Sequence, residues 1–168
     1  MPTFNVVQND TNELPNNIEA EQSVIGSILV SNEIFDEINI LITSKNFYDP
    51  MHQKIFSAIE KLIYSGMLAN PITLKNYFEK VKDEINVPDY LVKITKFSTS
   101  SRQAIEYSKL IYDLYVKREL IKISENVIDT AKLNDLDNDF LSAILIFSKI
   151  KFLFLLNSFN LDFLRFTS

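Results

Sequence analysis

Few side chains in this sequence could act as a catalytic group, and the first to consider surround its single histidine. His52 follows Asp49 by three residues, and Ser44 and Ser57 lie nearby in the chain, which is the composition of an acid–histidine–serine triad. Their spacing in the sequence gives no indication that they form such a triad. Asp49 stands directly before Pro50, a pair typical of a helix start that the aspartate caps. We therefore interpret His52 as a surface or capping residue one turn into that helix, and we predict no catalytic residue.

Two groups of charged residues could also form a site. Glu19 and Glu21 could act as paired acids, but residues two apart on a helix do not face each other. Acidic residues near a helix start are expected from the helix dipole alone. Lys117, Arg118 and Lys122 could contact phosphate, but acidic residues are interspersed with them. We interpret these three as part of a solvated helix face.

The composition excludes several kinds of site. The 168 residues include no cysteine, one histidine and two glycines. Disulfides, thiolate zinc sites and multi-histidine metal sites are therefore excluded, and a glycine-rich phosphate loop cannot be written with Gly26 and Gly66. A net charge of −5 argues against a chain that binds DNA alone by neutralising phosphate. We expect neither a metal nor a cofactor in this chain.

The first residues, 1–13, are polar and contain neither lysine nor arginine. They predict a disordered lead without a signal peptide. Because cysteine is also absent, the sequence favours a cytoplasmic protein.

Apolar residues then recur at helical spacing, which predicts an all-α fold with short loops. Pro15 and Asn16 open the first predicted helix, in which Asn16 and Glu19 have the spacing of a capping box. Gly26 inside this helix costs about 1 kcal/mol relative to alanine unless a neighbouring helix crosses closely. Further helix starts are predicted at Ser31–Asn32, Asp49–Pro50, Thr73 and Pro88–Asp89, and a helix end at Gly66.

The longest periodic stretch, residues 102–132, contains neither glycine nor proline and predicts a helix about 46 Å long. It carries two apolar stripes roughly 145° apart. The first stripe consists of Tyr107, Leu110, Leu114, Ile121 and Ile128. The second, named here the distal stripe, consists of Val116, Leu120, Ile123 and Val127. We expect one stripe to pack on the preceding helices and the other to face a hairpin partner helix or a second chain.

Five blocks of sequence carry a resemblance to a known family. They read LPNNIEAEQSVIG at 14–26, NFY at 46–48 followed by HQKIF at 52–56, ITL at 72–74, YL at 90–91, and YSKLI at 107–111 followed by KRELI at 117–121. In this order they resemble the N-terminal domain of DnaB-type replicative DNA helicases over about residues 14–132. One departure is Asn86-Val87-Pro88-Asp89, where the family has a Gly-Gly turn.

The resemblance implies a compact orthogonal helical head over 14–100 and one long helix of an incomplete helical hairpin over 101–132. In the family, these domains pair through the hairpin into dimers, three of which form a ring collar, and they help to dock primase. The ATP- and Mg²⁺-dependent motor is a separate domain, whose phosphate loop has no counterpart here. The resemblance therefore implies a truncated helicase: a non-catalytic module for self-association and primase docking that contacts DNA only indirectly.

Residues 133–168 are an atypical hydrophobic tail that resembles neither the second hairpin helix nor a linker. Seven phenylalanines and seven leucines fall within residues 140–168, and four charged residues interrupt them. A membrane span needs about 20 mostly apolar residues, so none is favoured. Two interpretations stay open: an arm that packs on the head, or the frameshifted end of an A/T-rich gene.

The function of the distal stripe has two interpretations as well. It could pack within the chain against residues 136–156, or it could mediate self-association. The alternative to a helicase module is a helical adapter whose hydrophobic tail associates with a membrane or another protein. A third possibility, a small enzyme, is supported by no group of residues.

Overall fold

The structure is a computed structural model that describes residues 13–80 and 87–132, together with Leu145 and Ser148. All regular structure in these residues is helical, which confirms the predicted all-α fold. The predicted lead and hydrophobic tail lie outside the described residues, apart from Glu13, Leu145 and Ser148. The α-helices are α1 (Ile18–Val30), α2 (Phe35–Leu41), α3 (Pro50–Tyr64), α4 (Pro71–Lys80), α5 (Val87–Ile94) and α6 (Ser101–Ala131). Three short 3-10 helices join them: η1 (Asn32–Ile34), η2 (Ser44–Asn46) and η3 (Thr95–Phe97).

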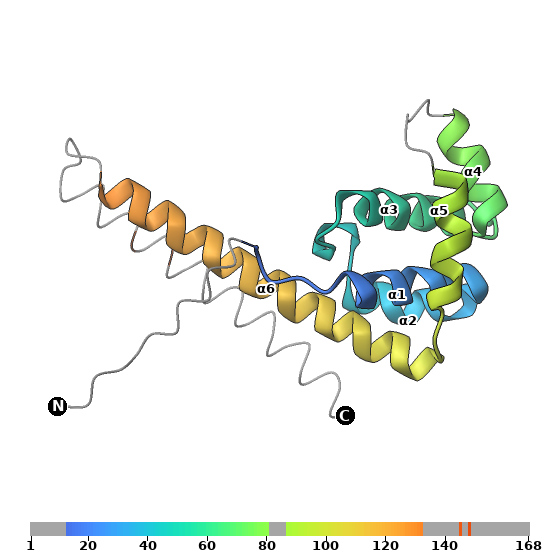
Figure 1. The fold of residues 1–168 in the computed structure, drawn as a ribbon, viewed down its shortest axis with the longest axis horizontal. Helices are drawn as coiled ribbons and strands as arrows, with labels where there is room; N and C mark the ends of the chain where they lie inside the picture. Colours follow the sequence, from blue (N-terminus) through green and yellow to red (C-terminus); the bar gives the residue numbers. More distant parts are fainter. Residues whose placement is uncertain (1–12, 81–86, 133–144, 146–147, 149–168) are drawn as a thin grey trace.

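Helix α1 lies at the centre of the head, where it packs against α3, α5, η3 and α6 (Figure 1). Its N-cap is Asn17, whose side-chain oxygen accepts a hydrogen bond from the backbone N–H of Ala20 at 2.9 Å. The predicted capping box of Asn16 and Glu19 is therefore wrong. Asn17 has extended backbone angles, so the chain turns into the helix one residue later. The Asn16 amide instead donates to the carboxylate of Glu13 and the carbonyl of Leu14.

Gly26 lets the end of α5 cross α1 at close range. A Cβ atom at this position would collide with the carbonyl oxygen of Ile94 and lie 3.3 Å from the backbone nitrogen of Ser98. Beside it, the Ser27 hydroxyl accepts a hydrogen bond from the backbone N–H of Thr99 at 2.9 Å. The expectation of a close neighbour at Gly26 is thus confirmed, and the glycine fixes how α5 and η3 lie on α1.

Helix α3 begins and ends where the sequence predicts. The Asp49 carboxylate accepts hydrogen bonds from the backbone N–H groups of Met51 at 2.7 Å and His52 at 3.4 Å, and Pro50 is the first helical residue. Gly66, with φ of 77°, provides the left-handed conformation that follows the helix end. Asp49 is therefore an N-cap and not the acid of a triad.

Two other helix starts differ from the prediction. Asn32 does not cap a helix, because its side chain bridges to the loop before α4: it donates to the Ala69 carbonyl and accepts from the Ala69 N–H, both at 2.8 Å. Helix α4 is capped by Asn70 and not by Thr73. Pro71 is the first helical residue, so the N-cap is the residue directly before it, Asn70. The Asn70 side-chain oxygen accepts a hydrogen bond from the N–H of Thr73 at 3.0 Å.

Helix α6 is the long helix of the prediction, and it supports the head from below in Figure 1. The Ser100 hydroxyl caps it by accepting from the N–H of Gln103 at 3.3 Å. Its first half packs against α1 and α2, whereas its second half projects past the head (Figure 1). The core lies between α1, α2, α3 and α5, where Phe35, Phe47 and Phe56 are fully buried.

Candidate functional site

The face of α6 that packs on the head includes two small residues, Ala104 and Ser108. Ala104, Ser108 and Ile111 are buried there, and the Ser108 hydroxyl donates to the Ala104 carbonyl at 2.9 Å. From the first stripe, Tyr107 and Leu110 pack against the core, whereas Ile128 is exposed. The expectation that a whole stripe packs on the head holds only for its first two residues. Because the side chains of Ala104 and Ser108 are small, α1 packs closely on α6 there. The buried face of α6 is therefore the one that carries Ala104, Ser108 and Ile111, and not the whole first stripe.

Arg118 fastens the middle of α6 to the head. Its side chain is 7% exposed, and its two terminal nitrogens donate to the carbonyl of Pro15 at 2.8 Å and to the carbonyl of Asn46 at 2.6 Å. The guanidinium also lies over the rings of Tyr48 and Tyr115, 5.5 and 6.0 Å from their centroids. Burial lowers the pKa of Arg118, and the nearby Glu21 carboxylate opposes that shift.

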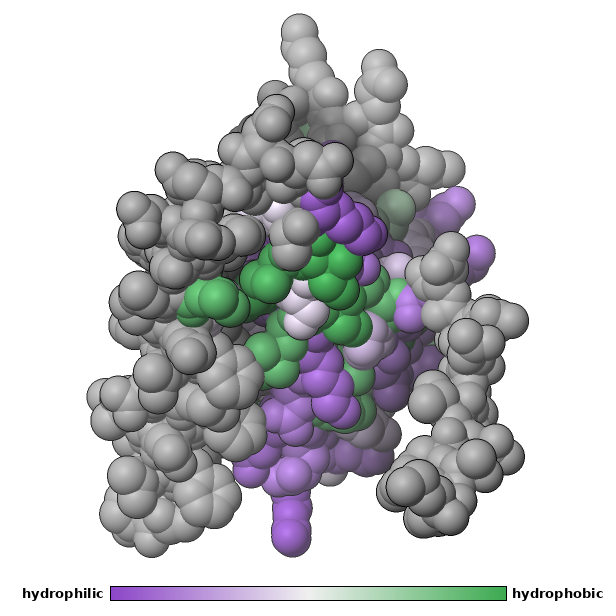
Figure 2. Space-filling view, turned by 90° about the vertical axis from the view of Figure 1, so that its left-hand side faces the viewer, coloured by the Kyte–Doolittle hydropathy of each residue, from purple (hydrophilic) through white to green (hydrophobic). Residues whose placement is uncertain are grey.

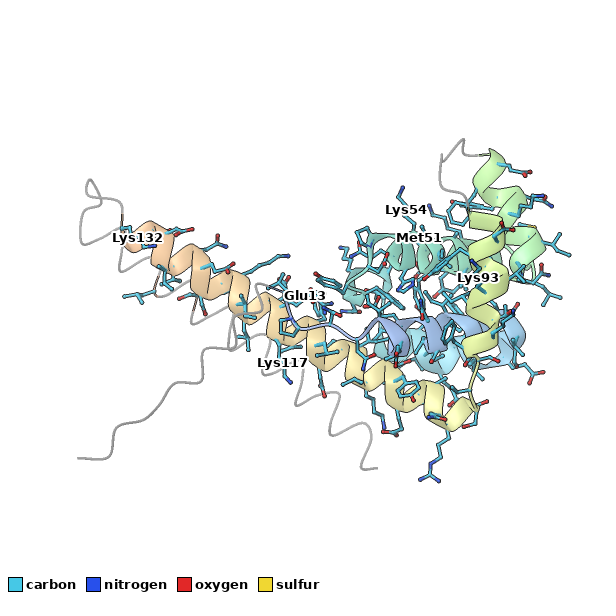
Figure 3. The ribbon with its side chains drawn as sticks, in the orientation of Figure 1. Glu13, Met51, Lys54, Lys93, Lys117 and Lys132 are labelled. Atoms are coloured by element: carbon cyan, nitrogen blue, oxygen red, sulfur yellow. The ribbon has the colours of Figure 1, made fainter. Side chains whose placement is uncertain are left out.

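The prediction that Lys117, Arg118 and Lys122 lie on a solvated face is therefore wrong for Arg118 and confirmed for the two lysines. Lys117 and Lys122 are exposed, and Figure 3 shows Lys117 on the side of α6 that faces away from the head. Lys122 pairs with Glu119 on the surface at 3.2 Å. Alternating charges alone could not separate the buried arginine from the exposed lysines.

Glu21 is a buried acid at the junction of α1 and α3. One carboxylate oxygen accepts the backbone N–H of Tyr48 at 2.5 Å, and the other accepts the N–H of Asp49 at 3.3 Å and contacts the His52 ring nitrogen Nδ1 at 2.7 Å. The side chain is 2% exposed. Glu19 and Glu21 both lie in the first turn of α1, as expected of acids at a helix start. Glu19 is exposed, whereas Glu21 is buried and binds groups outside its own helix, which the helix dipole alone does not explain.

His52 continues this polar network to α5. It is fully buried, and its Nε2 lies 2.6 Å from the hydroxyl of Tyr90, which also accepts from the Gln22 side-chain amide at 3.2 Å. Burial raises the pKa of Tyr90, and the Gln22 hydrogen bond opposes that shift. The prediction of a surface histidine is wrong. With both ring nitrogens occupied, His52 ties α1, α3 and α5 together and offers no free nitrogen to a substrate.

The distal stripe occupies the half of α6 that projects past the head. Its four residues, Val116, Leu120, Ile123 and Val127, are each partly buried. Ile128 beside them is 53% exposed. Figure 2 views the molecule from the side toward which α6 projects, and apolar residues gather in the middle of that face with hydrophilic residues below them. The predicted partner segment, residues 136–156, lies outside the described residues except at two positions.

Within residues 13–80 and 87–132, no group of three or more histidine, cysteine or acidic side chains is placed to hold a metal ion. None of the helices in the same ranges combines the length and apolarity that a bilayer crossing requires.

Comparison with known proteins identifies the family. Residues 13–113, more than half of the chain, match the family model of the DnaB-like helicase N terminal domain. The chain belongs to this family. Among curated relatives, the replicative DNA helicase DnaB of Rickettsia felis is 39% identical over 126 residues, which cover 74% of this chain and 26% of the relative. That of Rickettsia typhi is 41% identical over 120 residues, covering 70% and 24%.

The match is confined to one part of those relatives, since this DnaB-family chain spans about a quarter of their length. The fold is also found in a solved structure, the N-terminal domain of DnaB helicase from Mycobacterium tuberculosis. The two superpose with a TM-score of 0.73 at 21% sequence identity, over 82% of this chain and 96% of that chain. This agreement shows that the described helices adopt the fold of a DnaB N-terminal domain.

Proposed function

We propose that this chain is a non-catalytic assembly module of a replicative DNA helicase, which self-associates through the distal stripe and docks primase in the cytoplasm. The observation that carries the proposal is the position of the stripe. The head anchors α6 through Arg118, and three of the four stripe residues, Leu120, Ile123 and Val127, follow that anchor on the part of the helix that extends past the head. A partner helix from a second copy would cover them.

Burial of the stripe residues would favour such pairing. Full burial of a valine, leucine or isoleucine side chain contributes about 1.5–3 kcal/mol, and the four stripe residues are already partly buried, so each contributes less than this. In a two-fold pair the same residues are buried on both copies. Several kcal/mol are therefore available from this surface.

Sedimentation velocity of the full chain tests self-association. We expect the wild-type chain to sediment as a dimer or larger species, and Leu120→Asp with Ile123→Asp to sediment as a monomer, because two carboxylates would have to be desolvated in the interface. A matched control is Ser124→Asp with Asn126→Asp, which adds the same charge at exposed positions of the same helix. A wild-type chain that is monomeric from micromolar to near-millimolar concentration, or equal masses for the two variants, would refute the pairing.

The non-catalytic part of the proposal has its own test. In this proposal ATP and Mg²⁺ belong to a motor domain, and the described head supplies no group for them. Isothermal titration calorimetry with ATP and Mg²⁺ should detect no saturable binding to the full chain, and mixing with primase should give a complex whose mass includes both proteins. Saturable nucleotide binding, or the absence of a primase complex, would contradict the corresponding part.

A further inference from the structure

Half of the large apolar side chains that the described residues expose lie together at one end of the head. Of ten such side chains, five surround the turn between α3 and α4, and each of the five is between 51% and 73% exposed. Single apolar residues on a surface are ordinary, whereas a contiguous group marks a contact site. We name this group the turn patch; it consists of Ile40, Tyr64, Met67, Leu68 and Ile72.

The turn patch is one surface, to which α2, α3 and α4 all contribute. The Tyr64 hydroxyl accepts a hydrogen bond from the Asn39 side-chain amide at 2.7 Å, which places the end of α3 beside Ile40 on α2. The Leu68 carbonyl accepts a hydrogen bond from the Thr73 hydroxyl at 2.8 Å, which holds the turn against the start of α4. In Figure 1 this turn lies on the side of the head away from the projecting half of α6.

One border of the turn patch is formed by η1 and α2, which pack against the turn. The Asn32 side chain donates to the Ala69 carbonyl and accepts from the Ala69 N–H, both at 2.8 Å. Phe35 packs edge-on against the ring of Tyr64, with ring centroids 6.0 Å apart. The exposed residues of η1 and α2 therefore lie directly beside the patch.

This border is acidic and has no counter-ion within the described structure. Glu33, Asp36 and Glu37 are exposed on η1 and α2. Their carboxylates form neither an ion pair nor a hydrogen bond with any residue that the structure describes. Three negative charges therefore face solvent next to the exposed apolar side chains.

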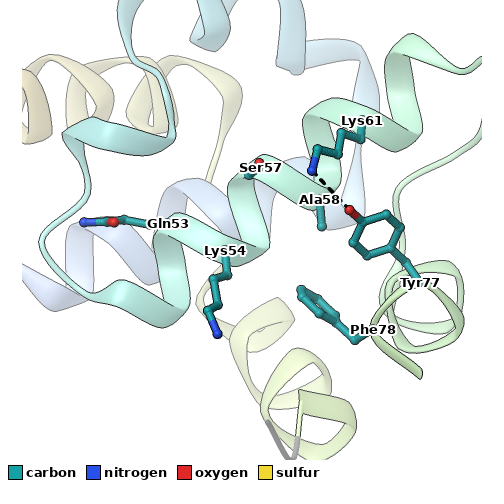
Figure 4. Close-up of a pocket in the computed structure, with 7 residues that line it drawn as sticks. All are labelled: Gln53, Lys54, Ser57, Ala58, Lys61, Tyr77 and Phe78. Carbon is teal, nitrogen blue, oxygen red and sulfur yellow. Dashed lines mark hydrogen bonds between the residues drawn. The ribbon is translucent and has the colours of Figure 1, made fainter. Parts of the chain in front are cut away.

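The lysines closest to the patch along the chain are held by residues of α4. The Lys61 ammonium donates to the Tyr77 hydroxyl at 3.3 Å (Figure 4). Lys75 pairs with Glu79 at 3.8 Å, one turn further along α4. Neither lysine neutralises the acidic border, so the α2 side of the patch attracts positive charge.

We propose that the turn patch docks a short segment of a partner protein that carries both apolar and basic side chains. The apolar side chains of that segment cover Tyr64 and Leu68, and its lysines or arginines meet Glu33, Asp36 and Glu37. A two-fold contact between copies of this chain through the patch is disfavoured, because it would bring the same carboxylates of both copies together. The same acids repel the phosphates of nucleic acids. The proposal goes beyond the proposed function and does not depend on pairing through α6.

Selection of a phage-displayed library of random peptides against the full chain tests this assignment. Enriched peptides should combine several lysines or arginines with at least one large apolar residue. Labelled copies should bind with an affinity that weakens as salt is raised, because the three carboxylates are exposed and ions screen them. Amide resonances of Met67, Leu68 and Ile72 should shift in NMR spectra on binding.

Apolar contact is tested by Leu68→Ser with Ile72→Ser. Both side chains are about 70% exposed, so the fold should be retained, as circular dichroism can check. Binding of the labelled peptide should weaken at least about tenfold, a change of about 1.4 kcal/mol. Val92→Ser with Ile128→Ser removes two exposed apolar side chains on α5 and α6 and should leave binding unchanged.

Charge complementarity is tested by Glu33→Lys with Glu37→Lys. This change should also weaken peptide binding at least about tenfold, and higher salt should no longer weaken the remaining binding. Asp113→Lys with Glu125→Lys makes the same charge change at exposed positions of α6 and is the matched control.

Four results would each overturn the proposal. They are a failure to enrich any peptide, enrichment of peptides without basic residues, and unchanged affinity for either pair of patch variants. The fourth is a lower sedimenting mass of the Leu68→Ser, Ile72→Ser chain than of the wild type, since it would show that a second copy covers the patch.

Discussion

Replacement of Glu21 by alanine should be among the most destabilising single changes in the head. The substitution removes the acceptor for two backbone N–H groups, those of Tyr48 and Asp49, and for the ring of His52. A buried donor left without a partner costs about 1–3 kcal/mol. Water entering the space of the lost carboxylate recovers part of this cost. We therefore expect Glu21→Ala to lower the free energy of unfolding by about 3–5 kcal/mol, as found when one member of a buried pair is removed.

The matched control lies two residues away on the same helix. Glu19→Ala makes the same chemical change at an exposed position and should alter stability by no more than about 0.5 kcal/mol. Glu21→Gln keeps the shape and one acceptor oxygen, so its effect should fall between the two alanine variants. This order follows from the number of hydrogen bonds that each side chain can accept.

Urea unfolding followed by circular dichroism measures these differences. With a urea dependence of about 1–3 kcal/mol/M, a loss of about 4 kcal/mol lowers the midpoint by roughly 2 M. The slope of the transition should stay constant, because the surface exposed on unfolding is nearly the same. If Glu21→Ala and Glu19→Ala unfold at the same midpoint, Glu21 does not organise the junction of α1 and α3, and the reasoning is refuted.

Three further predictions concern the packing of α1, α5 and α6. Gly26→Ala displaces the Ile94 carbonyl and should cost about 1–3 kcal/mol; an unchanged thermal midpoint would mean that α5 does not cross α1 so closely. Arg118→Met leaves two carbonyls without their donor and should cost about 2–4 kcal/mol in urea unfolding, with Lys122→Met near zero. Because burial raises the pKa of Tyr90 above the ordinary value of 10.0, the stabilisation from its protonated hydroxyl is complete below pH 10 and is lost as pH rises through the higher folded value. The urea midpoint should thus fall more steeply above pH 10 for the wild type than for Tyr90→Phe, and parallel curves would contradict this.

Local signals predicted the elements of the fold well. The Asp49–Pro50 helix start, the Gly66 helix end and the long helix from Ser101 were all expected, because each depends on backbone geometry that a few neighbouring residues determine. The cap of α4 was misplaced by three residues, since Asn70, Pro71 and Thr73 offer competing starts. Helix type and number are therefore readable from one sequence, and exact caps less so.

The buried polar residues could not be predicted by the same reasoning. A charged or ionisable side chain is exposed far more often than buried, so the sequence predicts Arg118 on a solvated face, His52 as a surface or capping residue, and Glu21 only as an acid of the helix start. Their burial depends on partners distant in sequence: Glu21 on Tyr48 and His52, and Arg118 on Pro15 and Asn46. One signal was present, because Glu21, His52 and Arg118 all lie within the sequence blocks that resemble the family.

Because Arg118 holds the middle of α6 on the head, a small tilt of the helix at this residue produces a larger displacement at its C-terminal end. The helix continues for about 20 Å beyond that residue at 1.5 Å per residue, so a tilt of about ten degrees at the anchor displaces its tip by about 3 Å. Such a displacement is more than half the rise of a helical turn and would put facing side chains of two paired helices out of register. In the proposed pairing, the precision with which two copies meet is therefore set inside the head, by the two hydrogen bonds from Arg118 to the carbonyls of Pro15 and Asn46.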